Sequence, residues 1–297
     1  MLFSTVFFLF IFLPIVLSIY FIVPSKFKNL VLFISSLIFY AWGEPIYVCI
    51  MIFSTILDYT IGMLINKNDK NETKRKLLLL TSVIINIGML GIFKYSDFFI
   101  SNINNIFKFN ISLINLPLPI GISFYTFQTL SYTIDVYRRK IDVQKNIISF
   151  GTYVALFPQL IAGPIVRYAT ISKEINERKV TSSLFADGII RFIEGLGKKV
   201  LIANSVGQIW SVIKASGISN MPVITAWFGI ICFALQIYFD FSGYSDMAIG
   251  LGKMFGFNFD ENFNYPYIST SITDFWRRWH ISLSTWFKEY IYIPLRR

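Results

Sequence analysis

The stretch MLFSTVFFLFIFLPIVLSIYFIVPS fills residues 1–25 and contains no charged side chain. About 20 consecutive apolar residues are enough for a helix to cross the hydrocarbon core of a bilayer. The stretch is longer than the apolar core of a secretory signal peptide and lacks its basic start, so we interpret it as a retained first span. These residues therefore predict a protein that crosses a membrane.

The rest of the chain has the same character. Hydrophobic residues make up 55% of the 297 residues and charged residues 15%, against roughly 45–50% and 25% in soluble domains. Further candidate spans cover residues 30–43, 45–65, 77–93, 117–134, 200–213 and 215–239. We predict an all-α, polytopic integral membrane protein: a single membrane-embedded domain over residues 1–297 with about 6–8 spans, a re-entrant segment and interfacial helices.

Basic residues gather in short clusters between the apolar runs. Lys and Arg number 27 against 17 Asp and Glu, which gives a net charge of +10. The clusters lie at positions 26–28, 67–76, 138–145 and 173–199. Such clusters are typical of cytoplasmic loops, so we predict an N-terminus outside the membrane, with Glu44 and Lys94 also outside. The pattern favours contact with membrane lipid and disfavours a nucleic-acid partner.

Metal and thiol chemistry have no support in the composition. The chain has two cysteines, Cys49 and Cys232, which lie far apart inside apolar runs, and one histidine, His280. Neither a disulfide framework nor a metal-ligand spacing can be built from them. We therefore predict no metal site.

Residues 146–166 form an apolar stretch with basic clusters on both sides. The stretch contains Pro158, Gly163 and Pro164, which would break a helix. Irregular backbone at membrane depth is tolerated only where protein or a water-filled cavity covers it. We therefore predict a re-entrant segment that lines a cavity, with Gln159 as a candidate on a substrate path. We interpret the prolines at positions 117 and 119 as residues that precede the start of an ordinary helix.

Two carboxylates follow the last long apolar run, in the sequence DFSGYSD that begins at Asp240. One interpretation is that the helix has reached the lipid headgroups by Asp240. Another is a cation site made by Asp240 and Asp246, which requires Gly243 and Gly250 to bend the chain, because this spacing puts the two carboxylates on different faces of a helix. Both interpretations stay open, and Asp240, Tyr244 and Asp246 are candidates on a substrate path.

Residues 271–290 are the richest in functional groups. Ser271 and Asp274 have the spacing of a capping box, which predicts the start of a helix, and Asp274 can pair with Arg278 one turn on. Aromatic residues recur at intervals of three and four, so we predict one helix with an aromatic face that carries His280. An interfacial lipid-binding helix would explain this pattern. The alternative is that His280, a neutral imidazole on an aromatic face, accepts or donates a proton.

Several stretches have the form of family signatures. The longest is DFWRRWHISLS at residues 274–284, followed by YIPL at 292–295. The others are MLFS at the start, YAW at 40–42, PIGISF at 119–124, QLIAGP at 159–164 and residues 236–247. With these stretches the whole chain resembles the membrane-bound O-acyltransferase family, in particular its bacterial branch that O-acetylates alginate and peptidoglycan.

The resemblance implies an all-helical enzyme of the bacterial cytoplasmic membrane with a central funnel. An acyl group, in this branch acetyl, would pass from a cytoplasmic donor such as acetyl-CoA to a hydroxyl of a polysaccharide or peptidoglycan outside, with no bound cofactor. His280 matches the signature histidine and is the implied catalytic residue, while Trp276, Arg277 and Trp279 would wall or position the site. The implied partner is an extracytoplasmic acetyltransferase or esterase-like protein.

Two other functions stay open at this point. One is teichoic acid D-alanyl transfer, a neighbouring activity of the same family, and the other is a non-enzymatic membrane scaffold or glycan-export component. The family pattern also has a second histidine downstream, whereas His280 is the only one in these 297 residues. We therefore expect the sequence to be the N-terminal portion of an acyltransferase, or a truncated product that cannot catalyse alone.

Overall fold

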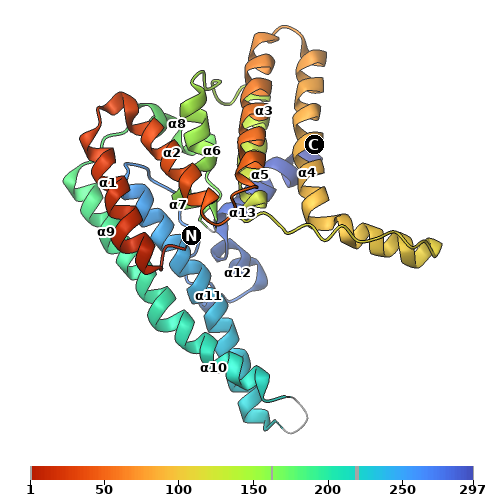
Figure 1. The fold of residues 1–297 in the computed structure, drawn as a ribbon, viewed down its shortest axis with the longest axis vertical. Helices are drawn as coiled ribbons and strands as arrows, with labels where there is room; N and C mark the ends of the chain where they lie inside the picture. Colours follow the sequence, from red (N-terminus) through yellow and green to blue (C-terminus); the bar gives the residue numbers. More distant parts are fainter. Residues whose placement is uncertain (1, 162, 218–220, 297) are drawn as a thin grey trace. The chain divides into compact units, whose positions relative to one another are not determined.

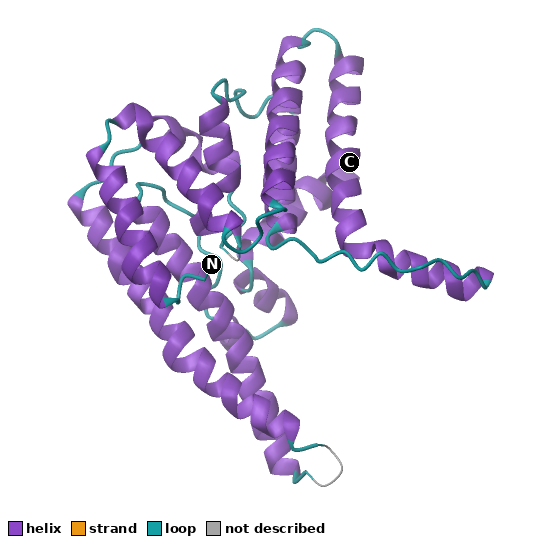
Figure 2. Cartoon of the chain, viewed as in Figure 1, coloured by secondary structure: helices purple, strands orange, loops and turns teal. Residues whose placement is uncertain are grey.

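The computed structural model describes residues 2–161, 163–217 and 221–296, and these residues form helices and connecting loops without a strand (Figures 1 and 2). They divide into two compact units. The first unit comprises Met1–Ser18, Ala162–Val166 and Lys173–Lys288, and the second Ile19–Ile161, Arg167–Ser172 and Glu289–Arg297. The all-α prediction is confirmed.

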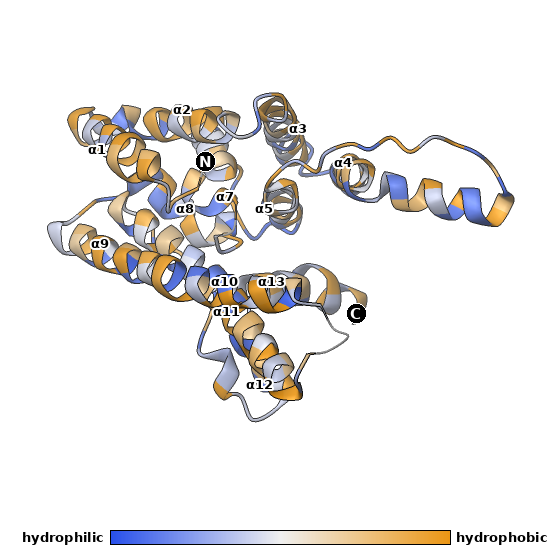
Figure 3. Ribbon diagram, turned by 60° about the horizontal axis from the view of Figure 1, so that its bottom comes forward, coloured by the Kyte–Doolittle hydropathy of each residue, from blue (hydrophilic) through white to orange (hydrophobic). Residues whose placement is uncertain are grey.

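Three helices within the described residues are long and apolar enough to cross a membrane: α3 (Val48–Lys67), α4 (Glu72–Phe107) and α11 (Val223–Met254). The predicted first span is shorter, because the apolar helix there covers Phe8–Ile22, as the π-helix η1 (Phe8–Phe12) and α1 (Leu13–Ile22). Much of α1 and α3 is hydrophobic in Figure 3. The membrane character is confirmed, and the number of spans stays a prediction.

The remaining helices are shorter. In the second unit they are η2 (Ser25–Phe27), α2 (Lys28–Ala41), α5 (Ile122–Tyr137), α6 (Ile147–Ala155) and α7 (Phe157–Leu160). In the first unit they are α9 (Ser182–Gly197), η3 (Lys198–Ala203), α10 (Asn204–Ala215), η4 (Pro266–Ile268), α12 (Ile272–Arg278) and α13 (Ile281–Phe287). Three more have residues at the unit boundaries or the end of the chain: α8 (Tyr168–Glu177), η5 (Lys288–Tyr292) and α14 (Ile293–Arg296).

Two pairs of glycines bring α9 and α11 together in the first unit. A Cβ atom added to Gly195 would lie 2.5 Å from the carbonyl oxygen of Gly243, and one added to Gly188 would lie 2.7 Å from that of Gly250. Small residues allow this close approach of membrane helices. A shared cation site of Asp240 and Asp246 requires a turn of the chain at Gly243 and Gly250. The structure has no turn there, because α11 is helical throughout and these glycines serve helix packing.

A buried polar cluster joins α3, α4 and α5 in the second unit. The carboxylate of Asp58 accepts hydrogen bonds from Ser82 Oγ at 2.5 Å, Asn86 Nδ2 at 2.9 Å and Thr133 Oγ1 at 3.3 Å. All four side chains are fully buried. Hydrogen bonds between membrane helices contribute about 0.6–2 kcal/mol each, so this cluster fixes the three helices relative to one another.

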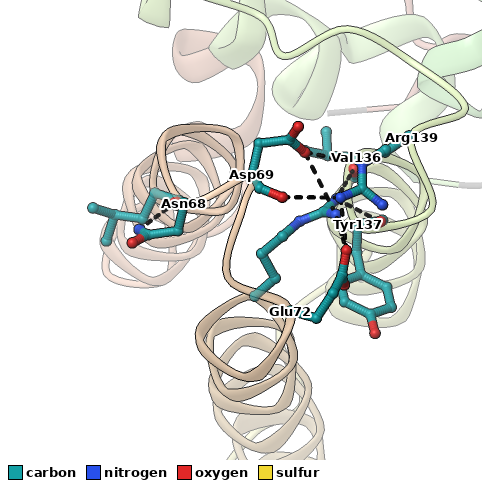
Figure 4. Close-up of polar contacts among 8 residues, drawn as sticks. Asn68, Asp69, Glu72, Val136, Tyr137 and Arg139 are labelled. Atoms are coloured by element: carbon teal, nitrogen blue, oxygen red, sulfur yellow. Dashed lines mark hydrogen bonds and ion pairs between the residues drawn. The ribbon is translucent and has the colours of Figure 1, made fainter.

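Two of the basic loops meet at one end of the second unit (Figure 4). Arg139 pairs with Asp69 at 2.9 Å and with Glu72 at 2.6 Å. The buried Arg75 donates to the carbonyl oxygen of Tyr137 at 2.7 Å. The loop between α3 and α4 therefore lies against the loop that follows α5.

The loop around residues 26–28 lies near the same end. Asn29 Nδ2 donates to Ser149 Oγ at 3.0 Å, and Tyr59 Oη donates to the carbonyl oxygen of Lys145 at 2.7 Å. Loops that face one side of a membrane must gather at one end of a helix bundle, and these three do. Which side that is stays a prediction.

The proline-containing segments behave as the sequence predicts. Helix α5 begins at Ile122, after the prolines at 117 and 119. The stretch 146–166 is broken at Leu156, where α6 gives way to the short helix α7 with Pro158 in its first turn. The predicted break is confirmed, whereas its position relative to a membrane stays a prediction.

Candidate functional site

The helix expected over residues 271–290 is interrupted at His280. Trp279 has extended backbone (φ −98°, ψ 127°) and His280 is left-handed (φ 44°, ψ 56°), so α12 and α13 are separate helices. Ser271 caps α12 by accepting from the Asp274 backbone N–H at 3.0 Å. The predicted cap is confirmed, but the single continuous aromatic face is wrong, because the chain changes direction at His280.

Arg278 and Asp274 form the predicted pair one turn apart, with Arg278 Nε 2.9 Å from Asp274 Oδ1. An ion pair between residues four apart on a helix contributes about 0.3–0.5 kcal/mol. The pair therefore supports α12 locally and does not account for the break that follows.

The break is held by a segment from elsewhere in the chain. Ile281 N–H donates to the carbonyl oxygen of Asn262 at 2.9 Å, and Asn264 N–H donates to the carbonyl oxygen of Arg278 at 2.9 Å. Backbone groups buried without a partner are costly, and these two hydrogen bonds satisfy groups that lose their helical partners. The loop after α11 thus fixes the backbone on both sides of His280.

The imidazole of His280 is partly buried among neutral groups. Its Nδ1 lies 3.0 Å from Asn262 Oδ1, and its ring packs edge-on against Phe241 with centroids 4.8 Å apart. Burial lowers the pKa of His280 from its ordinary 6.5 to about 4. The side chain is therefore neutral near pH 7 and able to accept a proton.

Asn262 and Ser282 complete this cluster. Ser282 Oγ donates to Asn262 Oδ1 at 2.9 Å and accepts from the backbone N–H of Ile165 at 3.0 Å. Neither residue was predicted as a site residue, although Ser282 lies within the signature at residues 274–284. The signal for Asn262 is its place between charged and aromatic residues in DENFNYPY, residues 260–267, which by itself suggests a turn.

Aromatic side chains surround the break on the Trp279 side. The Trp279 ring stacks on Phe275 with centroids 5.6 Å apart and meets Phe263 edge-on at 5.1 Å. Trp276 is 55% exposed and contacts the Phe275 ring, and Arg277 is exposed as well. Trp279 therefore belongs to the packed wall beside His280. The roles of Trp276 and Arg277 on a substrate path stay predictions.

The carboxylates of α11 have basic partners. Asp246 is buried and pairs with Arg191 at 2.7 Å and Lys198 at 2.5 Å, while Asp240 pairs with Lys199. No group of three or more His, Cys, Asp or Glu side chains that could hold a metal occurs within the described residues. The two carboxylates therefore face separate cations of α9 and η3.

Tyr244 lies on α11 between these carboxylates. Its ring stacks on Phe3 with centroids 4.6 Å apart, and the residue is 7% exposed. Its buried hydroxyl has no hydrogen-bond partner in the described part of the chain. A place on the substrate path stays a prediction for this residue.

A pocket of about 400 Å³ lies in the first unit and includes Ile281, the residue after His280. Arg191 bridges two carboxylates on its wall, with Asp246 at 2.7 Å and Glu261 at 2.5 Å. The complete lining is Arg191, Lys198, Tyr238, Ser242, Asp246, Glu261, Phe263, Asn264, Tyr265 and Ile281. Asp246, one of the predicted path residues, thus lines this pocket. The other lining residues include aromatic side chains and charged side chains that form ion pairs.

Gln159 belongs to the second unit, at the break between α6 and α7. It is fully buried, and its Nε2 donates to the carbonyl oxygen of Tyr153 at 2.6 Å. Its Oε1 has no partner among the described residues. The geometry gives Gln159 a role in holding the break, and its place on a substrate path stays a prediction.

The sequence of the chain matches the model of the MBOAT, membrane-bound O-acyltransferase, family over residues 36–297. The chain belongs to this family. It is 44% identical to the probable alginate O-acetylase AlgI of Pseudomonas aeruginosa over 299 residues, which cover 99% of this chain and 57% of that protein. It is 37% identical to the peptidoglycan O-acetyltransferase of Helicobacter pylori over 329 residues, with 99% and 62% covered.

A more distant relative is the teichoic acid D-alanyltransferase of Bacillus subtilis. It is 29% identical over 183 residues, which cover 60% of this chain and 46% of that protein. The chain spans 57% and 62% of the length of the alginate and peptidoglycan relatives named above. Membership of the MBOAT family makes His280 part of a membrane acyltransferase sequence, and what the whole protein acylates is a matter for proposal.

Proposed function

We propose that this chain is part of a membrane O-acyltransferase that transfers an acetyl group to a hydroxyl of an extracytoplasmic polysaccharide or peptidoglycan. The observation that carries the proposal is His280, a neutral imidazole set at a helix break. A neutral imidazole is able to accept the proton of an attacking hydroxyl. The names of the alginate and peptidoglycan relatives support acetyl as the group transferred.

The proposed path begins at a cytoplasmic donor such as acetyl-CoA, and no bound cofactor is required. The basic loops that gather at one end of the second unit support a cytoplasmic side there, with the N-terminus outside a bacterial inner membrane. Trp276, Arg277, Trp279, Gln159, Asp240, Tyr244 and Asp246 are the proposed path residues. The proposed partner is an extracytoplasmic acetyltransferase or esterase-like protein that completes transfer to the glycan.

The test is replacement of His280 in the complete protein that contains this chain. The wild type, His280→Ala and His280→Gln are expressed in a bacterium that lacks its own copy, and the acids released from its glycans by mild base are measured. Loss of a general base lowers a rate by about 10²–10⁴-fold, so both variants should release acetate at background level while reaching the membrane in normal amounts. Acetate at the wild-type level from His280→Gln would contradict the proposal.

The same measurement separates the other two functions. Release of D-alanine in place of acetate would assign the chain to D-alanyl transfer. Unchanged acetylation with altered glycan export, in cells without the protein, would indicate a scaffold or export component. Acetate that depends on His280 excludes both.

A further inference from the structure

Asn262 is fully buried and meets three groups through one side-chain atom. Its Oδ1 lies 3.0 Å from Nδ1 of His280, 2.9 Å from Oγ of Ser282 and 3.3 Å from the backbone nitrogen of Ser282. An amide oxygen can only accept hydrogen bonds and an amide nitrogen can only donate them. The identity of this atom therefore decides which nitrogen of His280 carries its hydrogen.

Ser282 identifies the atom as oxygen. Its backbone N–H can only donate, and it is directed at Asn262. Its hydroxyl oxygen already accepts from the backbone N–H of Ile165 at 3.0 Å, so the hydroxyl hydrogen is available for Asn262. The backbone N–H and the hydroxyl of Ser282 thus both donate to one atom of Asn262. An NH₂ group in that place would direct its own hydrogens at these two donors, so the atom is the oxygen.

We infer that Asn262 is a positioning residue that holds His280 as the Nδ1–H tautomer and leaves Nε2 as the nitrogen that accepts a proton. The amide oxygen of Asn262 has no hydrogen, so the hydrogen of this hydrogen bond must be carried by Nδ1 of His280. A neutral histidine side chain in water favours the opposite tautomer, with hydrogen on Nε2. The part that Nε2 plays in acyl transfer rests on the proposed function, whereas the tautomer itself does not.

The backbone of Asn262 supports the same role. Its carbonyl oxygen accepts from Ile281 N–H at 2.9 Å, directly after the left-handed His280. The left-handed conformation costs an L-residue roughly 1–2 kcal/mol, and this hydrogen bond offsets part of that cost. Asn262 thus contacts both the backbone next to His280 and the His280 ring.

The single histidine of this chain makes a direct test practical. The chain is produced with ¹⁵N-labelled histidine in detergent micelles, and long-range proton–nitrogen correlations are recorded near pH 7. Hδ2 of the ring couples strongly to Nε2 and weakly to Nδ1, so the nitrogen that carries the hydrogen is identified from one spectrum. In a longer protein with more histidines, the signals of His280 are those that vanish in His280→Gln.

The variants are Asn262→Leu, Asn262→Asp and, as a matched control, Asn258→Leu. Asn258 lies in the same loop but is exposed and pairs with Glu174 at 2.9 Å. The wild type, Asn262→Asp and Asn258→Leu should show Nδ1–H, because each keeps an oxygen acceptor at position 262. Asn262→Leu should shift to Nε2–H. A wild type with hydrogen on Nε2 overturns the inference whether or not any variant folds, and so does Asn262→Leu with unchanged Nδ1–H.

Kinetics of the complete protein add a second readout. Asn262→Leu should lower kcat at least about tenfold, as loss of a tautomer-setting partner does in other enzymes, with the KM for the acyl donor nearly unchanged. Asn262→Asp should restore part of kcat. An Asn262→Leu enzyme with wild-type kcat and a shifted tautomer would contradict the positioning role. Acetylation that survives His280→Gln would remove the proposed function and leave the tautomer standing.

Discussion

The two helix breaks of this protein, at Leu156 and at His280, each give other partners to the donor and the acceptor of a missing backbone hydrogen bond. In an unbroken helix Phe157 N–H would donate to the carbonyl oxygen of Tyr153. At the first break the donor instead meets Ser36 Oγ at 3.0 Å and the acceptor meets Gln159 Nε2 at 2.6 Å. Two side chains substitute for one hydrogen bond of the helix.

At the second break the missing bond would join Ser282 N–H to the carbonyl oxygen of Arg278. The donor instead meets Asn262 Oδ1 at 3.3 Å and the acceptor meets Asn264 N–H at 2.9 Å. The two breaks differ in whether a proline lies beside them. Pro158 has no N–H to donate at the first, whereas between 271 and 290 there is neither proline nor glycine. The second break therefore depends on contacts with the loop after α11.

The difference should appear first in the pH dependence of stability. The unfolded chain takes up a proton on His280 near the ordinary pKa of 6.5, whereas the folded chain does so near its pKa of about 4. Between these values the unfolded state binds more protons, so the free energy of unfolding falls as the pH is lowered from about 6.5 to about 4. The change attributable to His280 is about 3 kcal/mol, because one pKa unit corresponds to about 1.4 kcal/mol.

The measurement is thermal unfolding in detergent from pH 7 to 4.5, for the wild type and His280→Gln. Carboxylates titrate in both proteins, so the difference between the two curves isolates His280. The wild type should lose more stability than the variant as the pH falls. If stability fell equally with pH in the wild type and in His280→Gln, His280 would not be buried in a neutral site. Protonation of His280 would then not distinguish the second break from the first.

The second prediction concerns the serines that support each break. Ser36→Ala removes the acceptor of Phe157 N–H, and Ser282→Ala removes the acceptor of Ile165 N–H. A buried N–H without a partner costs about 1–3 kcal/mol. Each variant should be destabilised by that amount in thermal unfolding. Ser205→Ala, which removes a hydroxyl from an exposed residue of α10, is the control and should stay within about 0.5 kcal/mol of the wild type.

The result would also show whether the breaks are equally dependent on their outside partners. Only Ser282 also contacts Asn262, through the same hydroxyl. A loss in Ser282→Ala clearly larger than in Ser36→Ala would indicate that the second break depends more on its neighbours. A loss confined to Ser36→Ala would contradict the view that loop contacts hold the chain at His280.

The contrast explains how far the sequence could predict this structure. Proline and glycine act through the local backbone, so the break near Pro158 was predictable. Aromatic residues at intervals of three and four do favour a helix, and α12 and α13 are both helical. The interruption at His280 comes from Asn262 and Asn264, which come close only in the folded chain. For the same reason the glycines of α9 and α11 were visible in the sequence, but their pairing was not.

The smallest predicted loss of stability follows from replacing Pro158, the residue that indicated the first break most clearly in the sequence. If Ser36 and Gln159 hold the first break, Pro158→Ala should leave it in place. Proline where its backbone conformation fits stabilises a protein by about 0.4–1 kcal/mol, chiefly by restricting the unfolded chain. Thermal unfolding of Pro158→Ala should show a loss of that size. The Phe157 amide should also exchange its hydrogen at the wild-type rate, once the lower global stability of the variant is taken into account, because its acceptor remains Ser36 Oγ.

The double variant Pro158→Ala/Ser36→Ala decides which cause is primary. Without Ser36, Phe157 N–H could regain a partner only by joining a continuous helix to Tyr153, whose carbonyl oxygen is held by Gln159. The expected result is a break that persists, with a Phe157 amide that exchanges faster. Slower exchange in Pro158→Ala alone would mean that the helix has closed, and that a single proline rather than the surrounding side chains creates the break.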